Sequence, residues 1–553
     1  MNVDTGALVG VAKQDIKMWN PAMDLYEQSS EDIWAAVCAS VRGAMAEAGV
    51  TPSQVCGIGF DATCSLVCLD SANEPVGIDP GAPNAQERNV IVWLDHRAEA
   101  QAARINRLDH ERLETVGGTI SPEMELPKLL WLKEELPEVF ACVDGGGKFL
   151  DLVDFLSYKA SDFKHDVRSL CTVVCKWNYD EALDGSGIGW DREFFTEVGF
   201  DDDDLSVQTI GSDVRAPGEP IPGGLGEEAA TELGLERGCA LAVGMIDAHA
   251  GGVGCLGAPL PGEHEGAGVV GGVQKVARLE ERLALICGTS SCHMASSIEP
   301  VFVPGVWGPY TSAMFEGLHL NEGGQSAAGK LLDFLIQRHA AYPKLREAAE
   351  AASRPPSALL NERAEVIATA TGAPSVAFLT SAFHMTPDFV GNRSPLADPS
   401  MRGAIVGLGL ADGLDELALL YLAAVQALAY QTRQIIDAME LSGHPPMKAL
   451  VACGGLTRNE LFVQTHADAI GRPIYLPREN EAVLLGASVL GATAGRAHAS
   501  VAEAMEAMTA IGKVVSPTED AELNTYHERK YEVFRRMVED QLDYQRMMQV
   551  HNT

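Results

Sequence analysis

The sequence predicts an α/β protein with more than one domain. Short apolar segments alternate along the chain with amphipathic helical patterns, an arrangement typical of α/β architecture. With 553 residues the chain is too long for a single hydrophobic core, which indicates two to four domains. Hydrophobic residues make up 46% and charged residues 21% of the sequence, proportions that fit a folded globular protein and not a disordered one.

The first clear elements are a helix and a strand within the first 60 residues. Ser29 precedes apolar residues at helical spacing, and Gly49 is suited to end that helix. A predicted strand covers residues 55–60 and leads into a polar turn at residues 61–65. Ligands of open α/β sheets bind at the carboxyl ends of strands, so this turn is a candidate site.

Two further apolar segments complete the first half of the chain. Residues 90–94 form a predicted strand, and residues 240–246 form a buried strand that places Asp247 at its carboxyl end. The stretch from 258 to 280 is rich in glycine, proline and charge, and we expect it to be a domain junction.

The second half repeats the alternation of strands and helices. A strand at 283–287 runs into a Gly-Thr-Ser turn, and the C-terminal segment 526–547 is helical with an apolar stripe that we expect to pack against the rest of the protein. Between them the pattern predicts a helix at 415–441, a strand at 449–453 and a helix at 481–494.

Composition excludes several classes of partner and compartment. The formal net charge of −36 repels nucleic acid and anionic lipid. No stretch approaches the ~20 apolar residues of a membrane span, and no signal peptide is visible, so we expect a cytoplasmic protein. Many of the twelve cysteines lie in apolar runs and are expected to be buried, reduced thiols. The pairs Cys64/Cys68 and Cys171/Cys175 share C-x3-C spacing but lack a second half, so no structural zinc site is expected.

Asp247 is the strongest candidate for acid–base chemistry. A carboxylate at a strand end, followed by small residues, can accept the proton of a substrate hydroxyl, although an aspartate at this position can equally cap a helix. Residues 252–257 of the same segment match G-x-G-x-x-G. They lie inside a predicted helix, well past the strand, so we do not expect a dinucleotide site there.

Three glycine-containing segments are candidates for binding phosphate or nucleotide. Gly288-Thr289-Ser290 follows a strand and offers backbone N–H groups and hydroxyls. Asn321-Glu322-Gly323-Gly324-Gln325 is predicted to open a helix. Cys453-Gly454-Gly455-Leu456-Thr457-Arg458-Asn459 follows another strand and admits close approach of a ligand.

In this order, the segments resemble the FGGY family of carbohydrate kinases over nearly the whole chain. The family's strand-end motif is matched by Ile246-Asp247-Ala248-His249-Ala250-Gly251, its second phosphate loop by residues 287–290 and its adenosine motif by residues 453–459. Its Gly-Glu-Arg-x-Pro segment appears with a change, as Gly391-Asn392-Arg393-Ser394-Pro395. The resemblance implies two actin-like ATPase (ribonuclease H-like) domains that enclose a cleft.

One loop resembles a particular branch of this family. Thr63-Cys64-Ser65-Leu66-Val67 is similar to the Thr-Cys-Ser-Leu-Val loop of D-ribulokinases, and Cys175-Lys176-Trp177 is also similar to that branch. The resemblance implies ATP-dependent phosphorylation of D-ribulose to D-ribulose 5-phosphate. L-Ribulose, xylulose or a pentitol is the alternative substrate, and an inactive actin-like nucleotide-binding protein is the alternative class.

The resemblance also implies the roles of individual residues. Asp247 is the expected catalytic base and holds Mg²⁺ through water. The other expected sugar-site residues are Asp61, Ala62, Thr63, Cys64, Trp93, Lys176 and Glu322. Three of them have a purely structural alternative: Lys176 as a surface lysine, Cys64 as a small residue that fills space, and Glu322 as a helix cap. The expected ATP-site residues are Gly288, Thr289, Ser290, Gly324, Gln325, Gly454, Gly455 and Asn459.

The expected organisation follows from the same resemblance. Residues 1–262 form the sugar-binding domain, 275–522 the ATP-binding domain and 523–553 a C-terminal helix, and a homodimer is compatible with the family. One departure is expected at the start. Family members begin with a strand and an Asp-x-Gly-Thr-type phosphate hairpin, whereas Asp4-Thr5-Gly6 here corresponds to the turn that follows. We therefore expect neighbouring strands to lack a partner.

Overall fold

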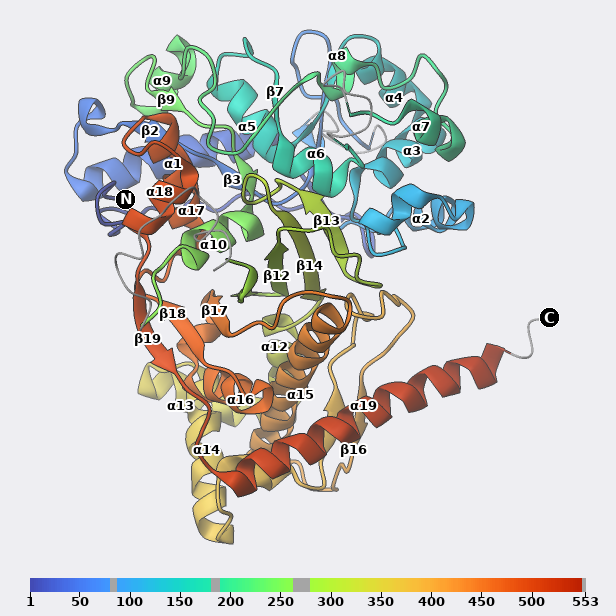
Figure 1. Ribbon diagram of the computed structural model, residues 1–553, viewed down its shortest axis with the longest axis vertical. Helices are drawn as coiled ribbons and strands as arrows, with labels where there is room; N and C mark the ends of the chain where they lie inside the picture. The colour runs from blue at the N-terminus through green and yellow to red at the C-terminus, as the bar shows by residue number, and fades with distance from the viewer. Residues whose placement is uncertain (80–86, 181–188, 262–278, 550–553) are drawn as a thin grey trace.

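The computed structural model describes residues 1–79, 87–180, 189–261 and 279–549. Figure 1 shows two α/β regions, the N-terminal one in blue to green and the C-terminal one in yellow to red. Residues 262–278, which make up most of the predicted domain junction, lie outside the described residues. The predicted domain limits at 262 and 275 lie there too. Across the described ranges, no helix combines the length and apolar character needed to cross a bilayer.

Among the described residues, the first domain contains a four-stranded sheet and three separate parallel strand pairs. Residues 1–26 contain no extended strand, and Trp19 forms an isolated antiparallel bridge with Glu27. The sheet has the order β1 (Glu27–Gln28), β5 (Val90–Ile91), β4 (Leu66–Leu69) and β6 (Lys148–Asp151). Two of the pairs are β2 (Gly57–Ile58) with β9 (Ala240–Leu241) and β3 (Asp61–Ala62) with β10 (Met245–Ile246). A further parallel pair joins β7 (Val167–Ser169) to β8 (Asp213–Arg215).

The first predicted helix is confirmed with both of its end signals. Helix α1 (Ser30–Ala48) begins after Ser29, whose side chain accepts a hydrogen bond from the Asp32 N–H, and ends at Gly49 in the left-handed conformation. The other helices of this domain are α2 (Glu99–Ile105), α3 (Glu125–Glu135), α4 (Pro137–Asp144), α5 (Leu152–Ala160), α6 (Leu170–Lys176), α7 (Arg192–Val198), α8 (Val207–Ile210) and α9 (Glu227–Leu233).

The second domain is built on a seven-stranded mixed sheet. Strand β11 runs parallel to β17, and β17 parallel to β18, while the other neighbours are antiparallel. The order is β13 (Trp307–Thr311), β14 (His319–Gln325), β12 (Ser291–Ser297), β11 (Arg282–Cys287), β17 (Ala449–Cys453), β18 (Ile474–Pro477) and β19 (Ile511–Val515). A separate hairpin pairs β15 (His384–Thr386) with β16 (Ala404–Val406).

Long helices cover this sheet. The predicted helix at 415–441 is confirmed as α15 (Leu414–Leu441), most of which is buried. The C-terminal helix α19 (Ala521–Gln549) packs Tyr531 and Phe534 against α15, as its apolar stripe predicts, and its end extends away from the body in Figure 1. The remaining helices are α12 (Gly329–Arg338), α13 (Tyr342–Ala352), α14 (Pro356–Thr371), α16 (Glu460–Ile470), α17 (Ala482–Ala494) and α18 (Val501–Met508).

A close helix pair joins the two regions. Helix α10 (Asp247–Leu256) follows β10 of the first domain and packs against α17 of the second. A Cβ atom at Gly254 would lie 1.9 Å from the Ala482 carbonyl oxygen, and one at Gly486 would lie 1.8 Å from the Ala250 oxygen. Gly254 of the G-x-G-x-x-G match therefore serves close packing between α10 and α17.

Two sequence-based expectations about local structure are wrong. Residues 321–325 belong to strand β14 and do not open a helix; the following helix, α12, begins only at Gly329. The predicted strand at 55–60 is reduced to β2, and the next strand, β3, includes part of the predicted polar turn. Alternation of apolar residues identifies strands poorly when they are two residues long.

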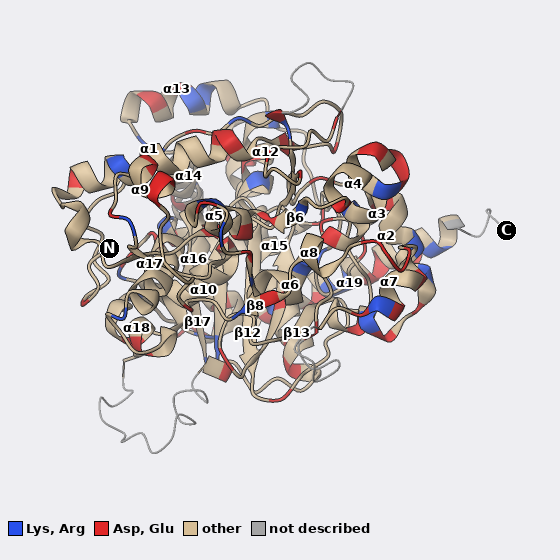
Figure 2. Cartoon of the chain, turned by 90° about the horizontal axis from the view of Figure 1, so that it is seen from above, with Lys and Arg blue, Asp and Glu red and all other residues tan. Residues whose placement is uncertain are grey.

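The acidic residues do not gather in one place. Figure 2 shows acidic positions spread over many helices and loops in this view, with basic positions between them. In this view the negative charge is not concentrated on one element.

Candidate active site

Two carboxylates lie at the ends of adjacent strands. β10 pairs in parallel with β3, with Met245 opposite Asp61 and Ile246 opposite Ala62, so Asp247 follows directly beyond the pair. Asp247 is the first residue of α10, and its Oδ1 accepts a hydrogen bond of 2.6 Å from the Ala248 N–H. Asp247 thus both follows a strand and begins a helix. Its second carboxylate oxygen remains available to accept a proton or bind a ligand.

The electrostatics of this pair favour a cation or a shared proton. Burial raises the pKa of Asp247. Burial, and then the charge of Asp247, raise the pKa of Asp61 well above its ordinary value. Carboxylate oxygens are the donors that Mg²⁺ prefers, and a divalent ion would relieve the repulsion between the two groups. The residues therefore fit the magnesium ion that the sequence predicts at Asp247.

A buried charged cluster lies beside Asp247. We define it as Lys176, His249, Glu322 and Arg393 around the ring of Trp307. Arg393 Nη2 donates to Glu322 Oε1 at 2.5 Å, and the other oxygen, Oε2, lies 3.1 Å from His249 Nε2. Lys176 Nζ and Arg393 Cζ each lie 4.2 Å from the centre of the Trp307 ring, which allows cation–π attraction.

Within this cluster, oppositely charged side chains shift each other's pKa values and so stabilise each other's charged forms. Burial alone would raise the pKa of Glu322, but Arg393 and the hydrogen bond to His249 hold it far below its usual range. Burial alone would lower the pKa of Lys176, but the negative charge of the Glu322 carboxylate acts in the opposite direction and the pKa is raised. Burial would likewise lower the pKa of His249, whereas Cys171 and Glu322 raise it to about 10. His249, Glu322 and Lys176 all act on the pKa of Asp247, so the cluster lies within its electrostatic reach.

The structure of this cluster excludes the structural alternatives for two residues, Lys176 and Glu322. Lys176 is only 3% exposed, so it is not a surface lysine. Glu322 lies within β14, with both oxygens engaged, so it is not a helix cap. His249 and Arg393 belong to motifs that the sequence had marked, and Trp307 lies in the predicted second half, but only the folded chain brings them to Glu322.

The polar turn of the first domain lies next to Lys176. Thr63 Oγ1 and Ser65 Oγ lie 3.1 Å apart, which orients the turn through its hydroxyls. Burial raises the pKa of the Cys64 thiol, and the nearby Lys176 opposes that shift. Cys64 is therefore a neutral thiol facing a lysine. Trp93 lies two residues beyond β5, is partly buried, and is not among the residues joined by the contacts described above.

The turn at residues 288–290 connects β11 to β12 and docks on a helix start. The carbonyl oxygen of Thr289 accepts hydrogen bonds from the backbone N–H groups of Ala328 and Lys330, and that of Gly288 accepts one from Gly329. Gly288 and Thr289 are exposed. The turn is thus held by its carbonyls, and its surface is free to meet a ligand.

A second glycine turn lies against the first. Gly454 has a φ of +97°, and a Cβ atom there would lie 2.4 Å from the Cys287 carbonyl oxygen. Gly455 has open space around the corresponding position. Asn459 caps α16 through its Oδ1, which accepts from the Leu461 and Phe462 N–H groups, and its Nδ2 donates to the Tyr421 hydroxyl. We call residues 288–290 and 454–455 the glycine turns.

Two predicted nucleotide-site residues have structural partners instead. Gln325 is buried and donates through Nε2 to the Leu428 carbonyl oxygen at 2.8 Å. Gly324 lies against Arg393, whose side-chain carbon Cδ would be 2.8 Å from a Cβ atom at this position. Both residues face the protein interior because residues 321–325 form a strand, so the exposed helix amides expected here are not formed.

The chain matches known proteins over both halves. Residues 1–254 match the N-terminal domain, and residues 283–495 the C-terminal domain, of the FGGY family of carbohydrate kinases. An FGGY carbohydrate kinase domain-containing protein of Homo sapiens is 49% identical over 98% of this chain and 94% of that protein. A D-ribulokinase of Saccharomyces cerevisiae is 38% identical over 89% of this chain and 69% of that protein.

A solved structure supports the predicted architecture. The ligand-bound xylulose kinase of Lactobacillus acidophilus superposes with a TM-score of 0.71 over 95% of this chain and 91% of that one, at 16% identity. At this identity the likeness concerns the fold, and it confirms the prediction of two actin-like ATPase domains. Because both family domains are matched in order and the human relative is similar over almost its full length, the chain belongs to the FGGY family of ATP-dependent carbohydrate kinases.

Proposed function

We propose that this protein transfers the γ-phosphoryl group of ATP to the terminal hydroxyl, O5, of D-ribulose. The observation that carries this proposal is the position of Asp247 at the end of β10, beside the residue 61–65 turn and the charged cluster. The 38% identity to a yeast protein named a D-ribulokinase supports this choice of sugar.

Asp247 is the proposed general base. Its free carboxylate oxygen takes the proton of O5 as that oxygen attacks the γ-phosphorus. Burial keeps the pKa of Asp247 raised, which makes it a better proton acceptor than an exposed aspartate. Asp247, acting through water, and Asp61 would hold Mg²⁺, which supplies neutralisation of the phosphate charge when bound.

The remaining residues position the two substrates. Thr63 and Cys64 present a hydroxyl and a neutral thiol to the sugar, with Asp61 and Ala62 in the adjacent strand and Trp93 as an apolar wall. Lys176, with its ammonium fixed over Trp307, donates to sugar oxygens. Glu322 acts mainly by holding Arg393 and His249 in place, because both of its oxygens are already engaged.

The glycine turns are proposed to hold the nucleotide. Residues 288–290 would receive the transferred phosphoryl group, and Gly454 and Gly455 would accept the flat adenosine, with open space beside Gly455. Asn459 borders this surface through its cap on α16. Gln325 and Gly324 support this region from inside the protein and are not proposed as ligands.

The test is a panel of acceptors with ADP release as the readout. D-Ribulose, L-ribulose, D-xylulose, L-xylulose and ribitol are compared at equal concentrations with ATP and Mg²⁺. The proposal predicts the highest kcat/KM for D-ribulose. A preference for another pentulose or a pentitol would reassign the substrate within the family. Absence of turnover with every acceptor, together with retained ATP binding, would favour the inactive nucleotide-binding alternative.

A further inference from the structure

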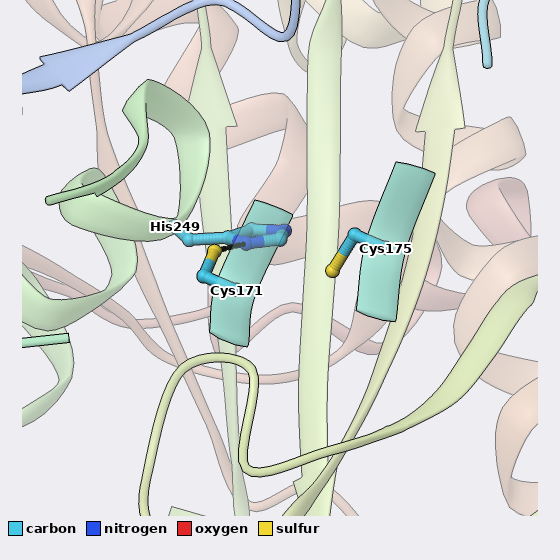
Figure 3. A group of neighbouring side chains, drawn as sticks. All are labelled: Cys171, Cys175 and His249. Carbon is cyan, nitrogen blue, oxygen red and sulfur yellow. Dashed lines mark hydrogen bonds between the residues drawn. The ribbon is translucent and has the colours of Figure 1, made fainter. Parts of the chain in front are cut away.

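Two buried thiols and the His249 imidazole of the charged cluster form a compact group of metal-ligand type. Cys171, Cys175 and His249 are 0%, 1% and 0% exposed, and one potential ligand atom from each lies within 4.8 Å of the others. Figure 3 shows the two thiols on successive turns of one helix and the imidazole approaching from another. We call these residues the thiol–imidazole group.

The fold creates this group from separate segments. Cys171 and Cys175 lie four residues apart on α6, so they share one face of that helix. His249 is the third residue of α10, and its Nδ1 lies 3.0 Å from Cys171 Sγ. From the sequence, the C-x3-C pair lacked further ligands and no zinc site was expected. The missing ligand comes from the helix that begins at Asp247.

A carboxylate sets the orientation of the imidazole. His249 Nε2 lies 3.1 Å from Glu322 Oε2, and Glu322 is in turn held by Arg393. Metal-bound histidines commonly donate their second ring N–H to a carboxylate, which fixes the ring and the tautomer. With Nε2 engaged in this way, Nδ1 is the nitrogen directed at the thiols.

We propose that Cys171, Cys175 and His249 bind one thiophilic divalent cation, with Zn²⁺ as the preferred ion. Two thiolates balance the two positive charges, so an uncharged centre results in a buried position where a net charge would be costly. Binding releases two protons, one from Cys175 and one from the Cys171–His249 pair, and leaves the Nε2 contact with Glu322 in place.

The distances allow this site with small side-chain movements. A tetrahedral zinc ion with bonds of about 2.3 Å to sulfur and about 2.0 Å to nitrogen holds its ligand atoms roughly 3.5–3.8 Å apart. The ligand atoms here lie within 4.8 Å of one another, and the Cys171–His249 pair is already at 3.0 Å. Side-chain rotations that move the ligand atoms by about 1 Å would therefore form the site, and the backbone of neither helix would need to move.

A water molecule is the expected fourth ligand, and the surroundings offer it a partner. The Tyr310 hydroxyl on β13 is buried and has no hydrogen-bond partner within the part of the chain that the structure describes. Helix α6, which carries both thiols, packs against β13, and the charge of Cys175 acts on the pKa of Tyr310, so the hydroxyl lies within electrostatic reach of Cys175. A metal-bound water would supply the contact that this hydroxyl lacks.

The other C-x3-C pair is a natural comparison. Cys64 and Cys68 have the same spacing, but among the described residues they belong to no group of three potential ligands. Cys68 is fully buried in strand β4 and takes no part in the proposed reaction. Cys68→Ser therefore changes a buried thiol in the same chemical way without touching the thiol–imidazole group.

The experiment uses Co²⁺ as a spectroscopic substitute for Zn²⁺ in the full-length, reduced protein. We expect one Co²⁺ per chain, with a near-ultraviolet thiolate-to-cobalt band and the visible absorption of a tetrahedral ion. Zn²⁺ should abolish both signals, and excess Mg²⁺ should leave them unchanged. Cys171→Ser and Cys175→Ser should each remove at least half of the near-ultraviolet band, whereas Cys68→Ser should retain all of it.

Two results would overturn the proposal. One is the absence of a thiolate-to-cobalt band in the folded wild-type protein at excess Co²⁺; the other is an unchanged band in both Cys171→Ser and Cys175→Ser. If these variants fail to fold, X-ray absorption on the zinc-loaded wild-type protein decides. Two sulfur ligands and at least one nitrogen ligand support the site, and a shell without sulfur refutes it.

Discussion

The charged cluster and the glycine turns are built differently. In the cluster, contacts run between buried side chains, as between Arg393 and Glu322, and the Trp307 ring carries two cations. In the glycine turns, contacts run between backbone atoms, as between the Gly288 carbonyl and the Gly329 N–H.

This difference shows what each region can tolerate. A buried network of charges depends on the identity of every member, because removal of one partner leaves another charge uncompensated. A backbone turn depends on conformation, and only positions without room for a Cβ atom are restricted. We therefore expect changes in the cluster to affect the sugar and changes in the turns to affect ATP.

The largest effect is expected at Asp247, the proposed general base. Asp247→Asn removes the base but preserves the side-chain shape, so kcat with the best sugar should fall by about 10²–10⁴-fold. The KM values should change little. Steady-state kinetics measure the rates, and calorimetry with sugar alone verifies binding. A kcat within threefold of the wild-type value would show that Asp247 is only a helix-start residue.

Glu322→Gln tests the charged cluster. The buried Arg393 guanidinium would lose its carboxylate, at a cost of about 3 kcal/mol in stability. We expect a lower thermal midpoint and a more than tenfold higher KM for sugar, with the KM for ATP unchanged. The matched control is Glu460→Gln, which removes an exposed ion pair with Lys513 and should change the midpoint very little. Equal effects of the two substitutions would contradict the account.

Gly454→Ala tests the glycine turns. The added methyl group would meet the Cys287 carbonyl oxygen at 2.4 Å, at a φ of +97° that costs alanine about 1–3 kcal/mol. The KM for ATP should rise about tenfold, and the KM for sugar should stay constant. Gly409→Ala is the control, because a Cβ atom there meets nothing within 4 Å. A rise confined to the KM for sugar would reverse the assignment of the two regions.

The smallest effect is a displaced pH dependence. Because burial raises the pKa of Asp247, its carboxylate becomes protonated at a higher pH than an exposed aspartate, whose pKa is about 3.9. The value of kcat should therefore fall as pH decreases through this raised pKa and remain constant above it. Measurement of kcat from pH 8 to pH 4.5, with fluorescence to verify folding, would show this decrease at acidic pH. A flat profile over that range would exclude a raised pKa for the base.

Much of the fold could be predicted where local signals were strong. Ser29 and Gly49 gave both ends of α1, and the 28-residue pattern of α15 and the apolar run of β17 were correct almost to the residue. The two-residue strands of the first domain and the strand at 321–325 could not be predicted, because their pairing partners are distant in the sequence.

The candidate site was predicted in part, for the same physical reason. Asp247 and Lys176 were identified from their motifs. The engagement of Glu322 by His249 and Arg393 depends on three segments that only tertiary structure brings together. The glycine-rich surroundings of Gln325 indicated an exposed helix start, whereas the residue ends a buried strand.

The most direct test of the central claim compares D-ribulose with 5-deoxy-D-ribulose, which lacks the proposed acceptor hydroxyl. With ATP and Mg²⁺, the account predicts that D-ribulose gives a single product with phosphate on O5, shown by phosphorus–proton coupling in NMR spectra. The 5-deoxy sugar should bind but give no phosphorylated product. Phosphorylation of the 5-deoxy sugar, or phosphate at another oxygen of D-ribulose, would contradict the claim that Asp247 serves O5.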